Sequence, residues 1–160
     1  MNKVDQANTA LYALVTTVCL DEGLPATAIV RNALHDLDEE DGADEGTSNQ
    51  RTLRILVEFK DGAPRTEAVS LSPKRYELNV GATLTILAIG EEAQGRAARL
   101  SIIGAIGVAL DADPTIGGAV SYAEIGDDPD DGQDEDDGAE MRGDILTIEM
   151  LVVDALTARG

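Results

Sequence analysis

Residues 90–97 have the types and spacing that come closest to a phosphate-binding loop. The segment Gly-Glu-Glu-Ala-Gln-Gly-Arg-Ala lies between a strand pattern and a helix pattern, and its two glycines have the required spacing. A nucleotide-binding loop then needs a lysine for the phosphates and a Ser or Thr hydroxyl for Mg²⁺. This chain has Arg96 and Ala97 there, and Glu91 and Glu92 would repel a nucleotide. The segment therefore predicts an ordinary connection and no nucleotide cofactor.

Two acidic segments offer carboxylates, the hard oxygen ligands that Ca²⁺ prefers. Residues 36–45 hold seven acids and residues 127–137 hold eight, with no base in either segment. An ordered Ca²⁺ loop needs its ligands in register around a central glycine. Counting with Gly132 or Gly138 as that glycine puts proline, glycine or glutamine where carboxylates are required. We therefore expect no metal site.

Nucleophilic catalysis has one candidate pair, because Cys19 and His35 are the sole cysteine and histidine. Thiol and imidazole act together only where the fold joins them, and no local signature supports that here. Cys19 lies beside the apolar stripe of a helix pattern, which indicates a small buried side chain. No cluster of Cys and His predicts zinc, and no serine has a Gly-x-Ser-x-Gly context. We expect no catalytic residue, no cofactor and no enzyme activity.

Two helices are expected to position the rest of the chain. Residues 4–20 carry apolar side chains at spacings of three and four, and Gly23 followed by Pro25 predicts the helix end. Residues 91–112 form the second pattern, whose expected apolar stripe is Ala93, Ala97, Leu100, Ile103, Ile106 and Leu110. Its glycines, Gly104 and Gly107, cost helix stability and are expected where a neighbour packs close. Arg96 and Arg99 are expected to pair with Glu91 and Glu92 within the helix.

Strand patterns fill the space between the helices. Residues 52–60 alternate cleanly, and Asp61-Gly62-Ala63-Pro64 predicts a hairpin turn into a weaker strand at 66–71. The strongest pattern, 76–89, puts seven residues on one face and has Gly81 in its middle, which predicts a bulge or bend. The seven are Tyr76, Leu78, Val80, Ala82, Leu84, Ile86 and Ala88. A short strand is expected within 27–34.

The last third adds a strand at 119–125 and a long one from Ile145 to Leu156. The long strand is apolar on both faces: Leu146, Ile148, Met150 and Val152 point one way, Ile145, Leu151 and Val153 the other. It is therefore either a central strand buried within one chain or part of a subunit interface. The order α-β-β-(β)-β-α-β-β predicts an α+β fold, with two helices packed on one face of a mainly antiparallel or mixed sheet.

Composition limits the classes of function. A chain of 160 residues is expected to form a single domain, 1–160, with an aliphatic core because it has no Trp and one Phe. The formal net charge is −19, and 15 of the 31 acids lie in the two acidic segments, which we expect to form loops at about 36–50 and 126–143. Such loops repel phosphate, so direct DNA binding through them is not expected. The sequence predicts no membrane span and no secretion leader, and one cysteine fits a reducing compartment.

Residues 97–125 resemble part of the tail terminator proteins of long-tailed bacteriophages, also called minor tail or tail completion proteins. The resemblance rests on a helix that ends in Ala109-Leu110-Asp111-Ala112-Asp113-Pro114-Thr115-Ile116-Gly117-Gly118 and continues to Tyr122-Ala123-Glu124-Ile125. In that family a similar "Ala-Leu, acidic, then Thr-Leu-Gly-Gly" segment precedes a strand, a variable loop and a final apolar strand. The element order fits over nearly the whole chain, and about 30 residues carry the specific part.

The resemblance implies a structural virion protein in the phage tail or neck, assembled in the cytoplasm of the bacterial host. It implies a homo-oligomeric ring, commonly a hexamer, that caps the tail tube, ends tube polymerisation and joins the tail to a head–tail connector or stopper. DNA passes through such a ring without specific binding, and an acidic wall would let it slide. The long acidic segments and the final Asp154-Ala155-Leu156, where the family has an aromatic residue, depart from the pattern. The alternatives are another neck protein, such as a connector or stopper, and an acidic protein-binding module that mimics DNA.

Overall fold

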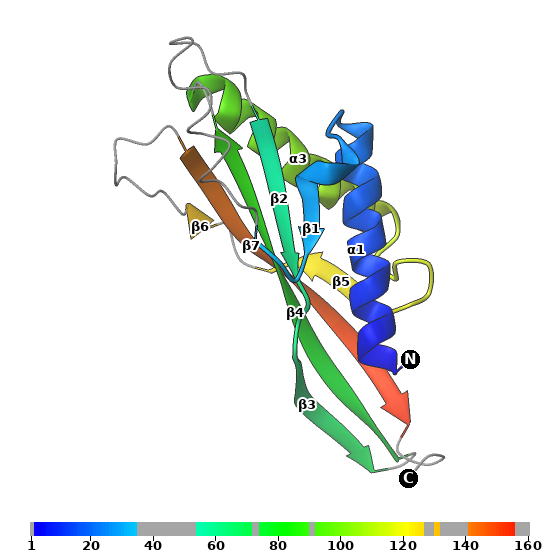
Figure 1. The fold of residues 1–160 in the computed structure, drawn as a ribbon. Helices are drawn as coiled ribbons and strands as arrows, with labels where there is room; N and C mark the ends of the chain where they lie inside the picture. Colours follow the sequence, from blue (N-terminus) through cyan, green and yellow to red (C-terminus); the bar gives the residue numbers. More distant parts are fainter. Residues whose placement is uncertain are drawn as a thin grey trace.

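The computed structural model describes residues 2–34, 54–71, 74–89, 92–126, 130–131 and 141–155, and their fold is α+β, as predicted (Figure 1). In chain order the elements are α1 (Lys3–Asp21), a 3₁₀ turn (Ala26–Ala28), β1 (Ile29–Arg31), β2 (Arg54–Lys60), β3 (Pro64–Leu71), β4 (Lys74–Ile89), α3 (Glu92–Ala112), β5 (Tyr122–Ile125), β6 (Asp130–Asp131) and β7 (Met141–Ala155). This is the expected order with one addition, the two-residue β6. The acidic segment at 36–50 and most of that at 126–143 lie outside the described residues.

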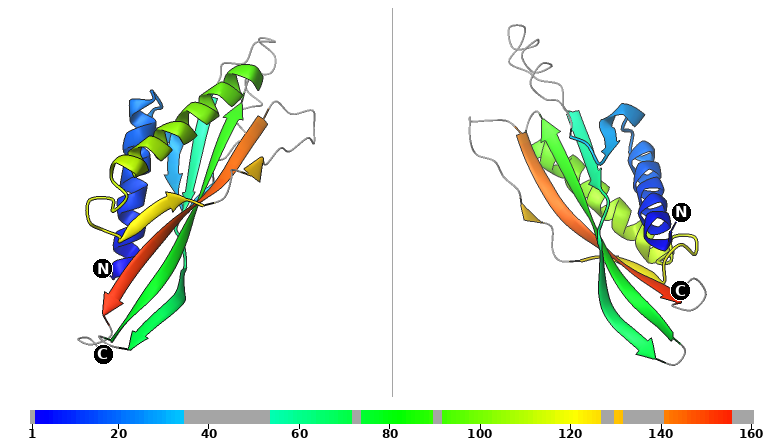
Figure 2. Two further views of the ribbon diagram at one scale, coloured as in Figure 1. Left: turned by 180° about the vertical axis from the view of Figure 1, so that it is seen from behind. Right: turned by 60° about the horizontal axis from the view of Figure 1, so that its bottom comes forward.

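The strands form one mixed sheet in the order β1-β2-β4-β7-β5, in which β3 also pairs with β4 and β6 with β7. β1 runs parallel to β2, and the other pairings are antiparallel. β4 and β7 are the spine of the sheet, because they pair along their whole lengths from Arg75↔Ala155 to Ile89↔Met141. α1 and α3 bury their side chains in one cluster with the same alternating strand residues, so they cover the same face, and α3 crosses in front of the strands in the view from behind (Figure 2). The predicted two-helix layer is confirmed.

The core lies between this helical layer and the sheet. The period-two pattern of β4 holds in the structure, since every second side chain from Val80 to Ala88 is buried on the helix face. β7 alternates in the same way from Leu146 to Val152, whereas β2 buries both Val57 in this core and Leu56 in a small second cluster with Ala28 and Ile89. Together with the helix stripes the strand residues on the helix face form one aliphatic cluster, which includes Leu11, Val15, Val57, Phe59, Leu84, Ile86, Ile102, Ile106, Leu146, Ile148 and Met150. Burial of such side chains contributes about 1.5–3 kcal/mol each.

Both ends of α1 are capped by residues that suit the position. At the N-terminus the Asn2 side chain accepts a hydrogen bond from the Asp5 N–H at 2.7 Å, which satisfies one of the free amides of the first turn. At the C-terminus the Gly23 N–H donates to the Leu20 carbonyl, and the Leu24 N–H donates to the Cys19 carbonyl. Gly23 has φ +99°, so this is a Schellman end that needs glycine. The prediction of this helix end is confirmed.

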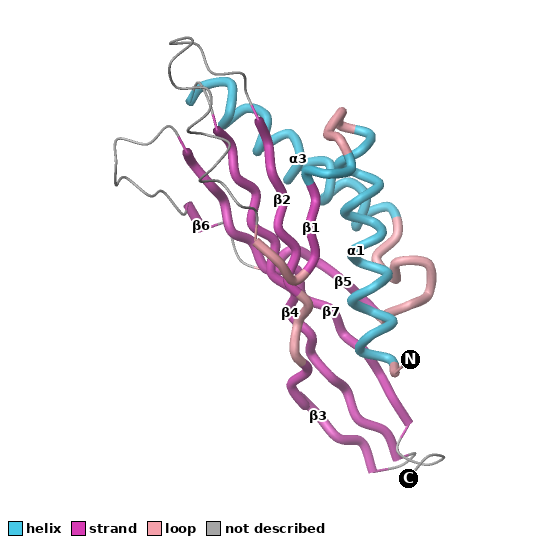
Figure 3. The backbone as a smooth tube through the Cα atoms, viewed as in Figure 1, coloured by secondary structure: helices cyan, strands magenta, loops and turns pink. Residues whose placement is uncertain are grey.

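The predicted hairpin at Asp61-Gly62-Ala63-Pro64 is wrong, because the chain does not reverse there. β2 and β3 run in the same direction along one edge of β4, β2 opposite 83–89 and β3 opposite 74–80. Lys60 pairs with Thr83 and Pro64 with Val80, so three residues, 61–63, stand opposite two, 81 and 82. The extra residue makes a bulge-like bend between β2 and β3 (Figure 3), and a second register shift lies within β3 between Thr66 and Ala68. The reversal lies instead between β3 and β4.

Close packing at the bend explains why glycine occupies position 62. A Cβ on Gly62 would come within 2.6 Å of the backbone carbonyl atoms of Gly81, which real structures do not tolerate. The bend also interrupts the ladder of backbone hydrogen bonds. The buried Asn8 side chain replaces them: Asn8 Oδ1 accepts from the Gly62 N–H at 2.9 Å, and Asn8 Nδ2 donates to the Gly62 carbonyl at 3.1 Å. The bulge predicted within 76–89 at Gly81 is not seen there, because β4 pairs with β7 without a register shift through Gly81; the irregularity lies opposite, at 61–63.

Arg31 holds the bend from the β1 side. Its guanidinium donates two hydrogen bonds to Asp61, from Nε to Oδ1 at 2.8 Å and from the terminal nitrogen to Oδ2 at 2.9 Å. It also stacks over the Tyr12 ring at 5.4 Å and donates to the Thr9 hydroxyl. The Asp61 N–H donates in turn to the Asn32 side chain. The hydrogen bonds from Arg31 lower the pKa of Asp61 from 3.8, so the carboxylate stays charged.

The face of α3 that packs on the sheet is only partly the predicted one, because Ile106 and Leu110 are buried as expected but the first half of the stripe is not. Arg99, Ile102, Ile106 and Leu110 are buried, whereas Leu100 is 50% exposed and Ala97 is exposed. The helix is apolar on more than one side, so periodicity alone does not select the face. Gly107 packs near Ile125 as expected, but an added Cβ at Gly104 would meet no atom within 4 Å.

Arg99 is buried because it meets a carboxylate from β7. Its Nη1 donates to Asp144 Oδ2 at 2.7 Å, and the side chains are 5% and 12% exposed. The Arg99 Nε has no hydrogen-bond partner. The expected pairing of Arg99 with Glu91 or Glu92 is therefore wrong: the partner lies 45 positions later. Such a buried pair fixes how α3 lies on β7 more than it adds stability.

Candidate functional site: the uncovered face of the sheet

The face of the sheet that points away from the helices is a candidate surface for a partner. Strand residues that alternate with the core project to this side, and Thr83, Thr85 and Thr147 are only half-buried there. Among the described residues α1 and α3 both pack on the other face (Figure 2), and on this one a small cluster of Ala28, Leu56 and Ile89 is buried. β3 and the adjoining parts of β4 and β7 also extend beyond α1 (Figure 1).

The second apolar row of β7 lies on this uncovered face. β7 is an interior strand in the described sheet, between β4 and β5, but its outward side chains are not fully buried. Ile145 is 38% exposed, and Leu151 and Val153 are half-buried. Tyr122 of β5, directly opposite Leu151, is 45% exposed. Within the described sheet β7 is thus a central strand, as one of the two alternatives expected, but its second apolar row is only partly buried.

A hollow opens where this face meets the end of β1. Its volume is about 390 Å³, and it is lined by Asn32, Ala33, Leu34, Glu58, Phe59, Lys60, Thr83 and Thr85. Leu34 is 82% exposed at its margin. The Asn32 N–H donates a hydrogen bond to the Phe59 carbonyl of β2. The positive φ of Asn32, +55°, then turns the chain away from β2. The hollow could receive an apolar side chain but brings together no set of catalytic groups.

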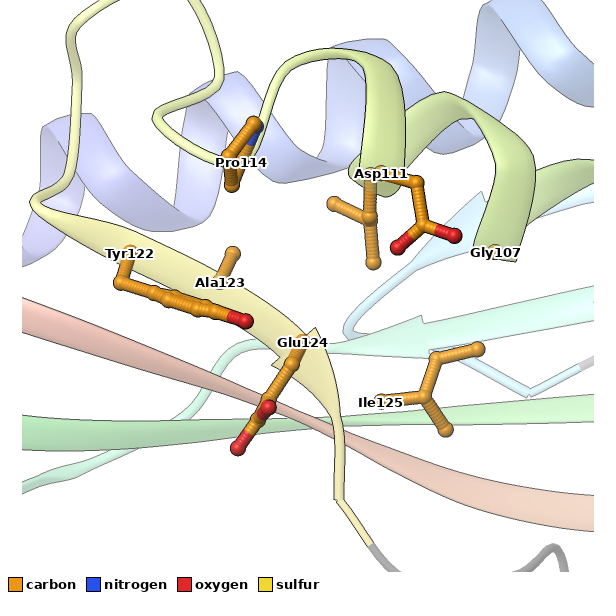
Figure 4. Close-up of a pocket in the computed structure, with 8 residues that line it drawn as sticks. Gly107, Asp111, Pro114, Tyr122, Ala123, Glu124 and Ile125 are labelled. Carbon is orange, nitrogen blue, oxygen red and sulfur yellow. The ribbon is translucent and has the colours of Figure 1, made fainter.

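A second cavity, of about 350 Å³, lies between the end of α3 and β5 (Figure 4). Its floor is apolar, with Leu110 and Ala123 buried and Ile125 half-buried. Its margin carries two exposed carboxylates, Asp111 from α3 and Glu124 from β5. Gly107, Pro114 and Tyr122 complete the lining, which contains no basic side chain. Sequence reasoning missed this cavity because α3 and β5 meet through tertiary packing.

The segment that carries the family resemblance forms a tight turn between α3 and β5. Asp113 accepts hydrogen bonds from the Gly117 N–H at 2.7 Å and the Thr115 hydroxyl at 2.9 Å. These bonds, the first above all, lower the pKa of Asp113 from 3.8. Ile116, Gly117 and Gly118 all have positive φ, of 49°, 67° and 91°. The glycines suit that conformation, whereas Ile116 is strained and is held by burial in the core.

The residues considered for catalysis do not form a site in the described part of the chain. Cys19 is fully buried, and desolvation, with a smaller contribution from Glu22, raises its pKa to about 11, so the thiol stays protonated. His35 lies outside the described residues, as do Ser72, Gly90 and Glu91. On the surface, the Ser101 hydroxyl donates a hydrogen bond to Glu22 Oε1 at 2.7 Å. Arg96 is exposed.

The described residues were compared with two requirements, a group of possible metal ligands and a helix able to cross a membrane. In the ranges that the structure covers, no three His, Cys, Asp or Glu side chains are grouped so that they could hold a metal ion. Neither α1 nor α3 has the combination of length and apolar character that crossing a bilayer requires. The chain matches no protein-family model and no curated protein.

Proposed function

We propose that this protein is a structural virion protein, a tail terminator of a long-tailed bacteriophage. It would cap the tail tube as a homo-oligomeric ring, most simply a hexamer, end tube polymerisation, and join the tail to the head–tail connector or stopper, with DNA passing through the ring. It would be assembled in the bacterial host cytoplasm. Residues 97–125 support the proposal by their resemblance to that family, and the α+β order of elements is compatible with it.

One structural observation carries the assembly part of this proposal: the apolar row of β7 that the helices leave uncovered. A ring subunit must expose a surface that another copy can bury. Leu151 and Val153, with Tyr122 opposite Leu151, and Ile145 further along the same strand beyond Thr147 and Glu149, offer such a surface on the face that α1 and α3 leave uncovered. An enzyme would instead need convergent titratable groups in a pocket, and neither described cavity has them.

The test is the mass of the purified protein in solution, by light scattering at near-physiological salt and several concentrations, with and without tail tubes. A species of six chains, or a monomer that forms rings on added tubes, supports the proposal. Ile145→Lys, on the uncovered face, should abolish the ring. Val108→Lys is the matched control, because Val108 is 69% exposed on α3, on the opposite layer, and it should leave the ring intact.

The same measurement separates the alternatives. A ring that binds the connector but ignores tail tubes would indicate another neck protein, such as a stopper. A strict monomer that ignores tubes and binds a basic protein would indicate an acidic protein-binding module, which the net charge of −19 also allows. Either result would overturn the terminator proposal.

A further inference from the structure

The cavity between α3 and β5 lies at a free edge of the sheet. β5 ends the strand order, and beyond β7 it pairs with no other strand of the described chain. An exposed edge strand has unpaired N–H and C=O groups and can accept an extended peptide as a further strand. β5 is four residues long, and the cavity runs beside it under the last turns of α3 (Figure 4). The geometry therefore suits a short extended segment.

The two sides of β5 would present different chemistry to such a segment. Ala123 and Ile125 face α3 and, with Leu110, make the apolar side. Tyr122 and Glu124 project to the uncovered face, and Glu124 points away from α3 (Figure 4). Side chains of an added strand alternate in the same way. A matching segment would thus have apolar residues on one side and residues complementary to Glu124 on the other.

Glu124 has a like-charged neighbour, which determines what those complementary residues are. Glu124 stands directly opposite Glu149 of β7 on the uncovered face, and like charges in that relation destabilise a sheet. The positions flanking Glu149 are glycines: Oε2 would lie 3.3 Å from a Cβ added at Gly126, and Oε1 3.8 Å from one at Gly81. The half-buried Glu149 side chain therefore occupies the space that side chains at these two positions would otherwise fill. Asp111 adds a third carboxylate at the cavity margin.

We propose that this cavity binds an extended basic segment of a partner protein, added along the free edge of β5. Its Lys or Arg side chains pair with Glu124 and Glu149, and its alternate apolar side chains pack against Leu110 and Ile125. A cation on the Glu124–Glu149 pair relieves the repulsion within it. The proposal goes beyond the tail-terminator function, and it holds for the isolated chain whether or not that chain caps a tail tube.

The test uses the isotopically labelled protein and the peptide acetyl-Leu-Arg-Leu-Arg-Leu-amide, titrated by NMR at near-physiological salt. The control peptide has citrulline in place of arginine, which keeps the shape and removes the charge. We expect the largest chemical-shift changes at the amides of 122–125 and 148–151. We also expect affinity at least about tenfold higher for the arginine peptide, equal to about 1.4 kcal/mol.

Matched variants separate this site from general attraction to an acidic protein. Glu124→Gln/Glu149→Gln should lower the affinity about tenfold, whereas Asp5→Asn/Asp21→Asn removes the same charge from exposed positions of α1 and should change it less than twofold. Equal binding of the citrulline peptide would overturn the proposal. So would shifts confined to the acidic segments 36–45 and 127–137, or equal losses in the two variants. Ring formation on tail tubes plays no part in this readout, so the two proposals fail separately.

Discussion

The side-chain amide of Asn8 forms hydrogen bonds with both backbone groups of Gly62, 54 positions further along the chain. Asn8 is 2% exposed on the inner face of α1, where an apolar residue would otherwise belong. It supplies the donor and the acceptor that the sheet cannot supply at the bend between β2 and β3. One polar side chain thereby fixes the position of α1 against the point where the edge of the sheet changes direction.

Asn8→Ala should strongly destabilise the fold. The change leaves the N–H and C=O of Gly62 buried without partners, and each such group costs about 1–3 kcal/mol. We expect the free energy of unfolding to fall by about 2–4 kcal/mol, measured by urea denaturation. Thr17→Ala is the control, since Thr17 is an exposed α1 residue, and it should change stability by less than about 0.5 kcal/mol. Equal effects of the two changes would contradict the role assigned to Asn8.

Two glycine-to-alanine changes should have opposite signs. At Gly62 the new Cβ would lie 2.6 Å from the Gly81 backbone, so Gly62→Ala must displace β4 or the bend and should destabilise the protein. At Gly104, inside α3, an added Cβ would meet no atom of the surrounding structure within 4 Å. Gly104→Ala should therefore stabilise the protein by up to about 1 kcal/mol through helix propensity. Thermal unfolding of both variants beside the wild type checks this. A rise in midpoint for Gly62→Ala would show that the close approach does not limit this site.

Removing one member of the buried Arg99–Asp144 pair should cost more than removing both. Asp144→Leu leaves a guanidinium buried without its carboxylate, and Arg99→Met leaves the carboxylate without its cation, at about 3–5 kcal/mol each. The double variant should recover most of that loss, because two apolar side chains leave no uncompensated charge. A double-mutant cycle of unfolding free energies measures the coupling. Additive losses would mean that the two residues do not act as a pair.

The pH dependence of stability should report the Arg31–Asp61 contact. Because the folded-state pKa of Asp61 lies below 3.8, its contribution is fully present above that value and is lost as the pH falls through the folded pKa. The stability difference between wild type and Asp61→Asn should therefore be largest near about pH 7 and shrink below about pH 4. Asp21→Asn, an exposed change on α1, serves as the control for loss of charge. A difference between wild type and Asp61→Asn that stays constant with pH would contradict the assignment.

Local sequence patterns predicted the parts of the fold that depend on interactions between residues close together in the chain. The alternation in 76–89 determines which side of β4 is buried, and the Gly23 helix end is set within six residues. The bend at Gly62 escaped prediction because Asp-Gly favours a hairpin locally. The groups that make it a bend, the Gly81 backbone and the Asn8 amide, lie far away in sequence.

Part of the buried face of α3 was predicted wrongly, and the reason is related. Leu100 and Ile103 fit an apolar stripe as well as Ile102 does, and the choice between them depends on Asp144, which draws Arg99 into the interior. The two cavities could not be predicted either, since each joins residues from elements that meet only in the folded chain. The uncovered row on β7, by contrast, was visible in the sequence as a strand with apolar residues on both sides.

The continuous pairing of β4 with β7 gives the molecule a mechanical property. Fifteen successive residue pairs, from Arg75↔Ala155 to Ile89↔Met141, join two antiparallel strands side by side. Their hydrogen bonds lie perpendicular to the strands, so a force along the strand axis loads them together in shear, whereas a force across the strands would open them one after another. A chain pulled along β4 and β7 would therefore resist extension far better than one whose strands are peeled apart from the side.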